Sequence, residues 1–420
     1  MINPQLLRDD EFEATAAALA RRGFDRSEVQ RLADLDARRR EVIAAVDEAR
    51  AEQNAASKLI GRASADEREA MIEQASRLKD RTTELEGQLT GAEADFEQAL
   101  VRVPNLPHPQ APDGQEGDGI VIRTVGTRPS FDHEPRDHVA LMEAADALDL
   151  TRGAKVSGAR FAFLKNEGVL LELALVRYAL DIAAKHGHAP VIPPVLVRRE
   201  AMYGTGFLPT DEQQLFRTDD RDDLYLVGTA EVPLAGMHQD EILDDVPVRY
   251  AGFSPCFRRE AGAHGKDTRG ILRVHQFDKV ELFSFVSADD SDAEHERLLG
   301  IEEEIFTGLG LHYQVVDIPV GDLGSSAARK FDLEAWMPGQ QAFREVTSTS
   351  NTTDYQARRL ACRYRTPDGA TALVHTLNGT ALAVQRAMIA VVETHQRADG
   401  SVAVPQLLVP YLGAEVLFAG

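Results

Sequence analysis

A repeat of apolar residues at alternating steps of three and four runs through residues 28–100 and constrains the fold more than any other feature of this sequence. A first run extends from Leu32 to Ile60 and a second from Met71 to Ala99. Apolar residues at this spacing form the seam between two supercoiled helices. A Gly-Arg-Ala-Ser segment separates the runs and allows the chain to reverse. The repeat therefore predicts an antiparallel α-helical coiled-coil hairpin, which is an extended arm and not a globular domain.

Two interpretations of this arm remain open: a coiled coil that joins two copies of the chain, or a probe for a nucleic acid. Basic residues gather near the predicted turn, whereas acidic residues crowd the base. Clustered positive charge binds a phosphate backbone, although a run of charges is usually only a solvated helix face. The basic candidates for nucleic-acid contact are Arg50, Lys58, Arg62, Arg68 and Arg77.

The whole chain is acidic, since 46 lysines and arginines stand against 68 aspartates and glutamates and leave a net charge of −22. This balance argues against a general nucleic-acid coat protein but permits a local basic patch. The N-terminus lacks the basic start and apolar core of a signal peptide, and no apolar run approaches the ~20 residues that span a bilayer. Cys256 and Cys362 do not make a disulfide framework or a zinc site. We expect a cytoplasmic protein with no membrane partner and no protein-held zinc.

Composition divides the remainder of the chain. Residues 104–135 are rich in Pro, Gly and Asp, which is typical of a linker. Beyond it, β-branched apolar runs alternate with helical patterns at 168–186, 292–309 and 380–394. This mixture predicts an α+β body around a mainly antiparallel β-sheet. The expected divisions are a first domain over 1–103, a linker over 104–135 and a second domain over 136–420.

Two predicted strands joined by a glycine-rich loop carry the first candidate site. Arg258 ends one strand, and the returning strand carries Phe277 and Glu281. Residues four apart on a strand share a face, so we expect these three side chains at one site. A guanidinium forks onto phosphate oxygens, an aromatic ring offers a stacking surface to a base, and a buried carboxylate accepts hydrogen bonds from an ammonium. A purely structural role stays open for each residue taken alone.

Two segments nearer the C-terminus add an acidic and a basic group. Glu345 lies in a polar strand flanked by small hydroxyl residues, and such a carboxylate suits Mg²⁺, which takes few protein carboxylates and completes its shell with phosphate oxygens and water. Arg386 lies early in a predicted apolar helix. An unpaired guanidinium there would be costly, so we expect an anion beside it.

In this order the segments resemble the three signature motifs of class II aminoacyl-tRNA synthetases, and in particular the seryl-tRNA synthetase family. The helix from Gly168 with Pro193-Pro194 is similar to motif 1, the dimer interface of that family. Phe257-Arg258-Arg259-Glu260 with its returning strand resembles motif 2, and the stretch from Asn378 to Arg386 resembles motif 3. The resemblance covers essentially the whole chain. It implies a class II antiparallel β-sheet catalytic domain flanked by helices over 136–420 and a tRNA-binding domain over 1–103.

The resemblance also implies a role for each matching residue. The catalytic set is Arg258, Glu345 and Arg386. The serine-binding set is Thr229, Ala230, Glu231, Arg258, Glu281, Asn378 and Thr380. The ATP-binding set is Arg258, Arg259, Glu260, Val274, Phe277, Glu345, Val346, Thr347, Ser348 and Arg386, of which Glu345 and Ser348 would hold Mg²⁺ together with ATP. The tRNA-binding set is the five basic residues of the arm.

The implied reaction is ATP-dependent activation of L-serine to seryl-adenylate, followed by transfer of the seryl group to the 3′ end of tRNA(Ser), which has a long variable arm. A homodimer through motif 1 is also implied, and tRNA(Sec) is a further acceptor that the sequence leaves open. Two other functions stay open as well: a paralogue that transfers serine to a non-tRNA acceptor, and a catalytically inactive RNA-binding scaffold. Ala381 and Gln385 depart from the family pattern, since many bacterial relatives have glycine at both positions, and this puts the packing of the nucleotide in doubt.

Overall fold

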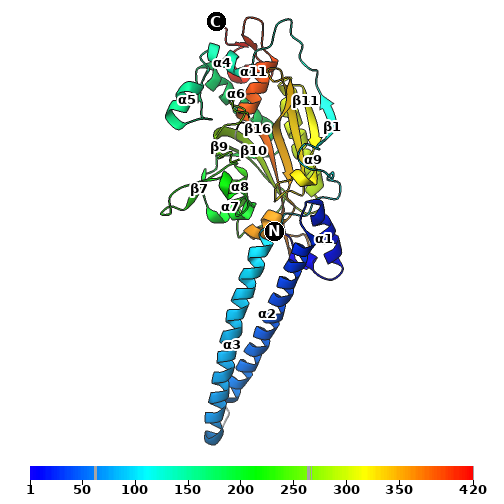
Figure 1. Ribbon diagram of the computed structural model, residues 1–420, viewed down its shortest axis with the longest axis vertical. Coiled ribbons are helices and arrows are strands. Elements are labelled where there is room, and N and C mark those ends of the chain that lie inside the picture. Colours follow the sequence, from blue (N-terminus) through cyan, green and yellow to red (C-terminus); the bar gives the residue numbers. More distant parts are fainter. Residues whose placement is uncertain (61–63, 263–264, 266, 420) are drawn as a thin grey trace. The chain divides into compact units, whose positions relative to one another are not determined.

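The computed structural model describes residues 1–60, 64–262, 265 and 267–419. The chain forms two compact units, one spanning Ile2–Leu106 and the other Pro107–Gly420 together with Met1. Figure 1 shows the first as mainly long helices and the second as a twisted sheet with surrounding helices.

The N-terminal unit is built on two long helices, α2 (Arg26–Ile60) and α3 (Ala65–Leu100), preceded by η1 (Pro4–Leu7) and α1 (Glu11–Arg21). Apolar seam residues such as Val46 and Phe96 are buried, as the repeat predicts. Two ion pairs join the helices, Arg50 with Glu86 at 2.7 Å and Arg81 with Glu52 at 3.1 Å. The later residue of α2 therefore pairs with the earlier residue of α3, as antiparallel helices require. The predicted antiparallel hairpin is confirmed.

A buried carboxylate fixes the base of this hairpin. Asp36 is 1% exposed and forms ion pairs with Arg8 at 2.8 Å, Arg39 at 2.9 Å and Arg40 at 3.0 Å. A carboxylate removed from water needs such partners, because an unpaired buried charge is strongly destabilising. Arg8 therefore ties the end of η1 to α2, while Arg39 and Arg40 pair with Asp36 from within the same helix.

The second unit is organised around an eight-stranded sheet whose strand order is β1-β11-β12-β13-β16-β10-β9-β4. Neighbouring strands are antiparallel except for β4 and β9, which are parallel. The predicted α+β body around a mainly antiparallel sheet is thus confirmed. The strands are β1 (Ile120–Val125), β4 (Ala189–Val191), β9 (Val248–Phe257), β10 (Gln276–Val286), β11 (Tyr313–Asp317), β12 (Arg329–Met337), β13 (Ala342–Asn351) and β16 (His375–Ala383).

Three longer helices pack on this sheet: α6 (Glu167–Lys185), α9 (Ser291–Gly308) and α11 (Val384–Thr394). Their apolar residues form one continuous core with the strands, including Leu171 from α6, Ile305 from α9 and Val391 from α11. Each of these side chains is fully buried. At ~25 cal/mol per Å² of apolar surface, this burial is the main force that holds the sheet against its helices.

Shorter elements complete the unit. The helices are α4 (His138–Ala144), α5 (Leu150–Ser157), α7 (Arg199–Thr205), α8 (Glu231–Gly236), α10 (Tyr355–Leu360), α12 (Val409–Leu412), η2 (Glu212–Gln214) and η3 (Val320–Asp322). The remaining strands are β2 (Leu148–Asp149), β3 (Phe163–Leu164), β5 (Leu196–Arg198), β6 (Phe216–Arg217), β7 (Leu224–Leu226), β8 (Ile242–Leu243), β14 (Arg363–Arg365), β15 (Thr371–Leu373), β17 (Val402–Ala403) and β18 (Val416–Leu417).

Two elements differ from the sequence expectation. The stretch 104–135, expected to be a linker, contains β1, which pairs with β11 at the edge of the sheet. The helix expected over 380–394 begins only at Val384, so that start was wrong. Residues 380–383 belong to β16 because they pair with β10 across Lys279–Glu281. Within the described part of the chain, no helix has the length and apolar character to cross a membrane.

Candidate active site

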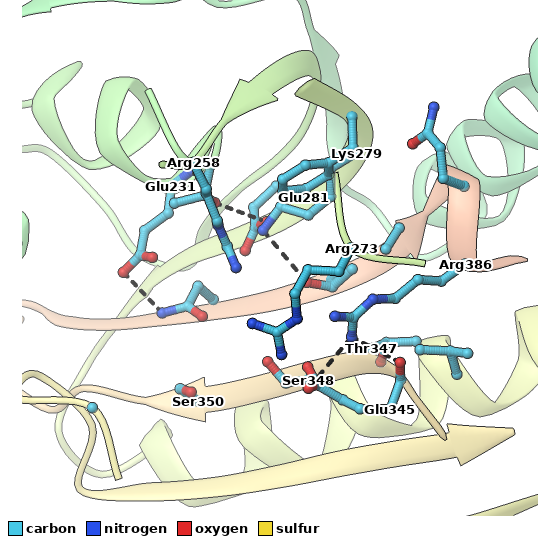
Figure 2. A pocket seen from close by; sticks show the side chains of 18 of the residues that line it. Glu231, Arg258, Arg273, Lys279, Glu281, Glu345, Thr347, Ser348, Ser350 and Arg386 are labelled. Carbon is cyan, nitrogen blue, oxygen red and sulfur yellow. Dashed lines mark hydrogen bonds and ion pairs between the residues drawn. The ribbon is translucent and has the colours of Figure 1, made fainter. Parts of the chain in front are cut away.

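A cavity of about 440 Å³ is lined by side chains from β10, β13 and β16, from the segment that follows β9, from the start of α11 and from the segment around Thr229 and Glu231 (Figure 2). Most residues predicted from the sequence line it: Thr229, Glu231, Arg258, Glu260, Val274, Phe277, Glu281, Glu345, Val346, Thr347, Ser348, Asn378, Thr380 and Arg386. Two predicted residues do not. Ala230 packs in the core beside Leu234, and the Arg259 Nε donates to the Leu215 main-chain oxygen at 2.7 Å.

Strand β10 supplies one wall of the cavity through alternate residues. Phe277, Lys279 and Glu281 all line it, because residues two apart on a strand point to the same face. Arg258 follows the end of β9 and lies opposite, with its guanidinium carbon 5.3 Å from the centre of the Phe277 ring. Its Nε also donates to the Gly228 main-chain oxygen at 3.2 Å. An aromatic face and a fixed guanidinium therefore stand together, as the sequence predicted.

A β-bulge in β13 explains how two residues three positions apart reach the same cavity. Glu345 pairs with Glu334 and Thr347 with Leu333, so Val346 is the extra residue between them. A bulge shifts the alternation of side chains by one, which brings Glu345 onto the face of Ser348. The Thr347 hydroxyl points the other way and donates to Glu302 on α9.

The acidic end of the cavity contains two buried glutamates. Glu231 Oε1 accepts hydrogen bonds from Gln356 Nε2 at 2.7 Å and from Asn378 Nδ2 at 3.1 Å. Burial, with the nearby Glu281 carboxylate, raises the pKa of Glu231 to about 7. Burial also raises the pKa of Glu281, although the Lys279 ammonium and the Thr229 hydroxyl oppose this shift. This end of the cavity is suited to an ammonium and a hydroxyl group.

Lys279 is a site residue that the sequence reasoning missed. Its side chain is 7% exposed, and its ammonium forms an ion pair with Glu281 (Figure 2). The Nζ also lies 3.5 Å from the Thr380 Oγ1. The signal was available, because strand alternation places Lys279 on the same face as Phe277 and Glu281. Lys330 and Arg273 also line the cavity without having been predicted.

The opposite end of the cavity is dominated by Arg386 and Glu345, which point toward one another in Figure 2. The Arg386 Nη1 donates to the Glu345 main-chain oxygen at 2.8 Å and lies 3.4 Å from its Oε2. Removal from bulk solvent raises the pKa of Glu345, but Arg386, Lys330 and Arg258 outweigh that effect and lower it to about 2. The carboxylate is thus ionised at neutral pH. In this structure the anion beside Arg386 is the Glu345 carboxylate.

The donor set at this end fits Mg²⁺. An ionised carboxylate and a hydroxyl, Glu345 and Ser348, share one face and leave room for oxygens from a ligand. Mg²⁺ binds through one or two carboxylates and completes its octahedron with phosphate oxygens and water. Within the described ranges, no cluster of three or more His, Cys, Asp or Glu residues could hold a metal without such a ligand.

The loop after β9 carries a strained residue beside the cavity. Glu260 has φ of +50°, in the left-handed region that side-chain-bearing residues rarely adopt. Its carboxylate forms an ion pair with Arg273 Nη1 at 2.7 Å. Strain of this kind persists where surrounding contacts impose it, and it occurs often at ligand sites.

Comparisons with known proteins assign this arrangement to a family. The chain matches the family models of the seryl-tRNA synthetase N-terminal domain over residues 1–107 and of the tRNA synthetase class II core domain (G, H, P, S and T) over residues 215–395. A serine–tRNA ligase from Nocardia farcinica is 52% identical over 419 residues, which is 99% of each chain. The chain belongs to the seryl-tRNA synthetase family.

Solved seryl-tRNA synthetases share its fold over the full length. The enzyme from Pyrococcus horikoshii, complexed with ATP, superposes with a TM-score of 0.93 at 40% identity and covers 99% of each chain. The cytoplasmic enzyme from Naegleria fowleri, in complex with AMP, has a TM-score of 0.88 at 32% identity and covers 99% of this chain and 98% of that one. The class II synthetase fold predicted from the motifs is therefore confirmed.

The two departures from the family pattern lie in different surroundings. Ala381 is the extra residue of a bulge in β16, between the pairs Val280–Leu382 and Glu281–Thr380, and it is fully buried in the core. Gln385, in contrast, lines the cavity. Of the two, only Gln385 is placed to affect a nucleotide directly.

The arm residues predicted to contact tRNA differ in their surroundings. Lys58 and Arg68 are exposed. Arg50 is paired with Glu86, and Arg77 with Glu73 at 3.3 Å. Arg62 lies outside the described residues.

Proposed function

We propose that this chain activates L-serine with ATP and transfers the seryl group to tRNA(Ser). The observation that carries the proposal is a single cavity with two chemically opposite ends. Buried acids and hydroxyls at one end, Glu231, Glu281 and Thr380, suit the ammonium and hydroxyl of serine. Arginines at the other end, with an aromatic ring between, suit a nucleoside triphosphate.

In the first step a serine carboxylate oxygen attacks the α-phosphorus of ATP, and the bond to the bridging oxygen breaks to release pyrophosphate. This reaction needs positioning and charge stabilisation more than a protein nucleophile. Arg258, fixed beside Phe277, would orient the substrate carboxylate and the α-phosphate, and Arg386 would bind the γ-phosphate. The Phe277 ring, Glu260 and Val274 would hold the adenine.

Magnesium would be held by Glu345 and Ser348 together with phosphate oxygens, and it would neutralise part of the charge on the triphosphate. The low pKa of Glu345 supports this role, because the carboxylate needs no proton loss to bind a cation.

The second step transfers the seryl group to a terminal ribose hydroxyl of the tRNA and releases AMP. Thr229, Asn378 and Thr380 would keep serine in place during the transfer. We assign the N-terminal arm to recognition of the tRNA, with the exposed Lys58 and Arg68 as its strongest candidates for phosphate contact. Charging of tRNA(Sec) belongs to the same proposal as a second acceptor.

An apolar face on α6 supports a homodimer. Val169, Leu170 and Leu173 are 40%, 54% and 55% exposed, whereas Leu171 and Leu175 of the same helix are buried. Exposed apolar side chains gathered on one face mark an interaction surface. Leu173→Asp should shift the protein from dimer to monomer in sedimentation experiments.

The experiment that tests the function is serine-dependent exchange between ATP and pyrophosphate, followed by charging of purified tRNA(Ser). A catalytically inactive scaffold would show no exchange. A paralogue with a non-tRNA acceptor would show exchange without charging of tRNA(Ser). Threonine and alanine should each support far less exchange than serine, because buried polar groups left without partners discriminate strongly against alanine.

A further inference from the structure

Gln385 connects two other elements of the active site through both ends of its amide. Its Oε1 accepts a hydrogen bond from the Asp278 backbone N–H at 2.9 Å, and its Nε2 donates to the Glu172 Oε2 at 3.3 Å. The side chain is 9% exposed and lines the cavity. An amide that uses both its acceptor and its donor has one preferred orientation.

The residues joined in this way are direct neighbours of groups assigned to ATP. Asp278 follows Phe277 on β10, and Gln385 precedes Arg386 in the first turn of α11. The hydrogen bond from Asp278 to the Gln385 amide thus connects β10, next to Phe277, to α11, next to Arg386. No register pair of β10 and β16 extends beyond Lys279–Ala383, so this side chain continues the connection where the strand pairing ends.

Glu172 brings a third element, α6, into the same cluster. Burial and the neighbouring Asp278 carboxyl raise the pKa of Glu172 to about 8, and burial also raises the pKa of Asp278. With a pKa of about 8, Glu172 is mostly protonated at neutral pH. The cluster therefore joins α6, β10 and α11 without an uncompensated pair of negative charges.

We propose that Gln385 is a positioning residue for ATP, which sets the separation between the Phe277 ring and the Arg386 guanidinium through its hydrogen bonds to Asp278 and Glu172. Both groups are assigned to ATP and line the same cavity, so a change in their separation weakens the binding of ATP. Serine is assigned to the other end of the cavity, so its binding is not expected to respond. The inference rests on the proposed function, and a direct measurement of ATP binding distinguishes failure of the inference from failure of that function.

Three variants test it. Gln385→Met keeps the length of the side chain and removes both hydrogen bonds. Gln385→Glu keeps the acceptor for the Asp278 N–H but replaces the donor to Glu172 with a further carboxyl oxygen. The double variant Glu172→Gln/Gln385→Glu exchanges the two groups, so that the amide stands at position 172 and the carboxyl at position 385. Gln406→Met, at an exposed glutamine, is the matched control.

Exchange kinetics should show a change in the KM for ATP and little else. We expect Gln385→Met and Gln385→Glu to raise that KM by about tenfold or more, with kcat and the KM for serine within threefold of wild type. The exchanged double variant should recover most of the ATP affinity of Gln385→Glu. Calorimetry with ATP alone should give the same order of affinities, and this readout stands even if wild-type enzyme shows no serine-dependent exchange.

The inference is overturned if Gln385→Met leaves ATP affinity within twofold of wild type at an unchanged melting temperature. It is overturned equally if the KM values for ATP and serine rise together, because that pattern indicates general loss of structure. Failure of the double variant to improve on Gln385→Glu would also reject it, since hydrogen bonding would then not be the cause.

Discussion

Arg386 holds Glu345 at two points, since its Nη1 donates to the main-chain oxygen at 2.8 Å and lies 3.4 Å from the carboxylate. A residue of α11 thereby sets the position of Glu345, the residue of β13 that precedes the bulge. Arg386, proposed to bind the γ-phosphate, thus helps to fix the position of Glu345, which is proposed to bind Mg²⁺.

Replacing Arg386 should therefore impair activation more than the loss of one phosphate contact. Arg386→Ala should lower serine-dependent ATP–pyrophosphate exchange by ~10²–10³-fold, in the range for removal of a transition-state contact. Arg386→Lys keeps the charge without the planar fork and should be intermediate. Exchange rates at saturating serine measure both. Rates within threefold of wild type for both variants would show that Arg386 has no part in activation.

Serine use should depend on pH through Glu231, whose pKa is raised to about 7 by burial and by Glu281. Above this pH the carboxylate is charged and can pair with the serine ammonium, and below it the group takes up a proton and loses that charge. We expect kcat/KM for serine to fall by about tenfold from pH 8 to pH 6, since this ratio reports ionisations of the free enzyme.

Two controls accompany that profile. Glu231→Gln cannot titrate, so its kcat/KM for serine should be low and flat over the same range. The kcat/KM for ATP should vary less than that for serine in wild-type enzyme. A flat serine profile in the wild type would contradict the assignment of Glu231 to the ammonium.

Removing Lys279 should destabilise the fold. Lys279→Met leaves Glu281, which is 2% exposed, without its ion-pair partner, and a buried pair broken on one side costs about 3 kcal/mol or more. The double variant Lys279→Met/Glu281→Gln should recover most of the loss. Urea unfolding at pH 7 measures both effects, and equal stabilities of the two variants would refute the expectation.

The Lys279→Met deficit should also shrink at lower pH. Without the lysine, the folded-state pKa of Glu281 stays above its unfolded value because of burial, so the folded protein binds more protons than the unfolded chain. Stability contributed by this group is then present at low pH and lost as the pH rises through the folded pKa. Urea unfolding of wild type and Lys279→Met at pH 5 and pH 8 measures this deficit, which should be smaller at pH 5.

Shortening the arm should separate activation from tRNA charging. Joining Asp47 to Gln88 by a short glycine-rich turn removes the outer part of α2 and α3 and keeps the Asp36 cluster at the base. Exchange should stay within twofold of wild type, while kcat/KM for tRNA(Ser) should fall at least ~10²-fold because the phosphate contacts are lost.

A milder variant controls for the truncation. Lys58→Glu/Arg68→Glu keeps the arm intact and reverses two exposed charges, so it should weaken charging and leave exchange unchanged. Normal charging by the shortened enzyme would favour a different role for the arm, such as joining two copies of the chain.

Periodic sequence made the arm predictable, because its seam repeats over many turns and depends only on local spacing. The edge strand β1 was not predicted, since Ile120, Val121 and Ile122 are all exposed and show no alternation. Its flanking glycines and aspartates are typical of a loop. Pairing with β11, which lies nearly two hundred residues later, decides its conformation.

The start of α11 is a second case in which distant strand pairing overrides the local sequence pattern. Small residues before Val384 are compatible with a helix, but β10 pairs with them and holds them extended. In the site, residues with known motif positions were found by resemblance, whereas Lys279 and Gln385 were not given roles. Strand alternation on β10 could have pointed to Lys279. The contact of Gln385 with Asp278, in contrast, joins segments about a hundred residues apart in sequence, and no local pattern reports it.

The position of β16 in the middle of the sheet, between β13 and β10, has a consequence for synthesis of the protein. The four strands that frame the active site cannot close until His375–Ala383 has left the ribosome. The N-terminal unit ends at Leu106, so its helices can fold long before that. At ~5–20 residues per second, the interval is roughly 15–60 s. During this time the N-terminal helices can be folded while the sheet still lacks β16 and exposes unpaired strand edges. Folding in the cell therefore requires that these edges be protected from other chains.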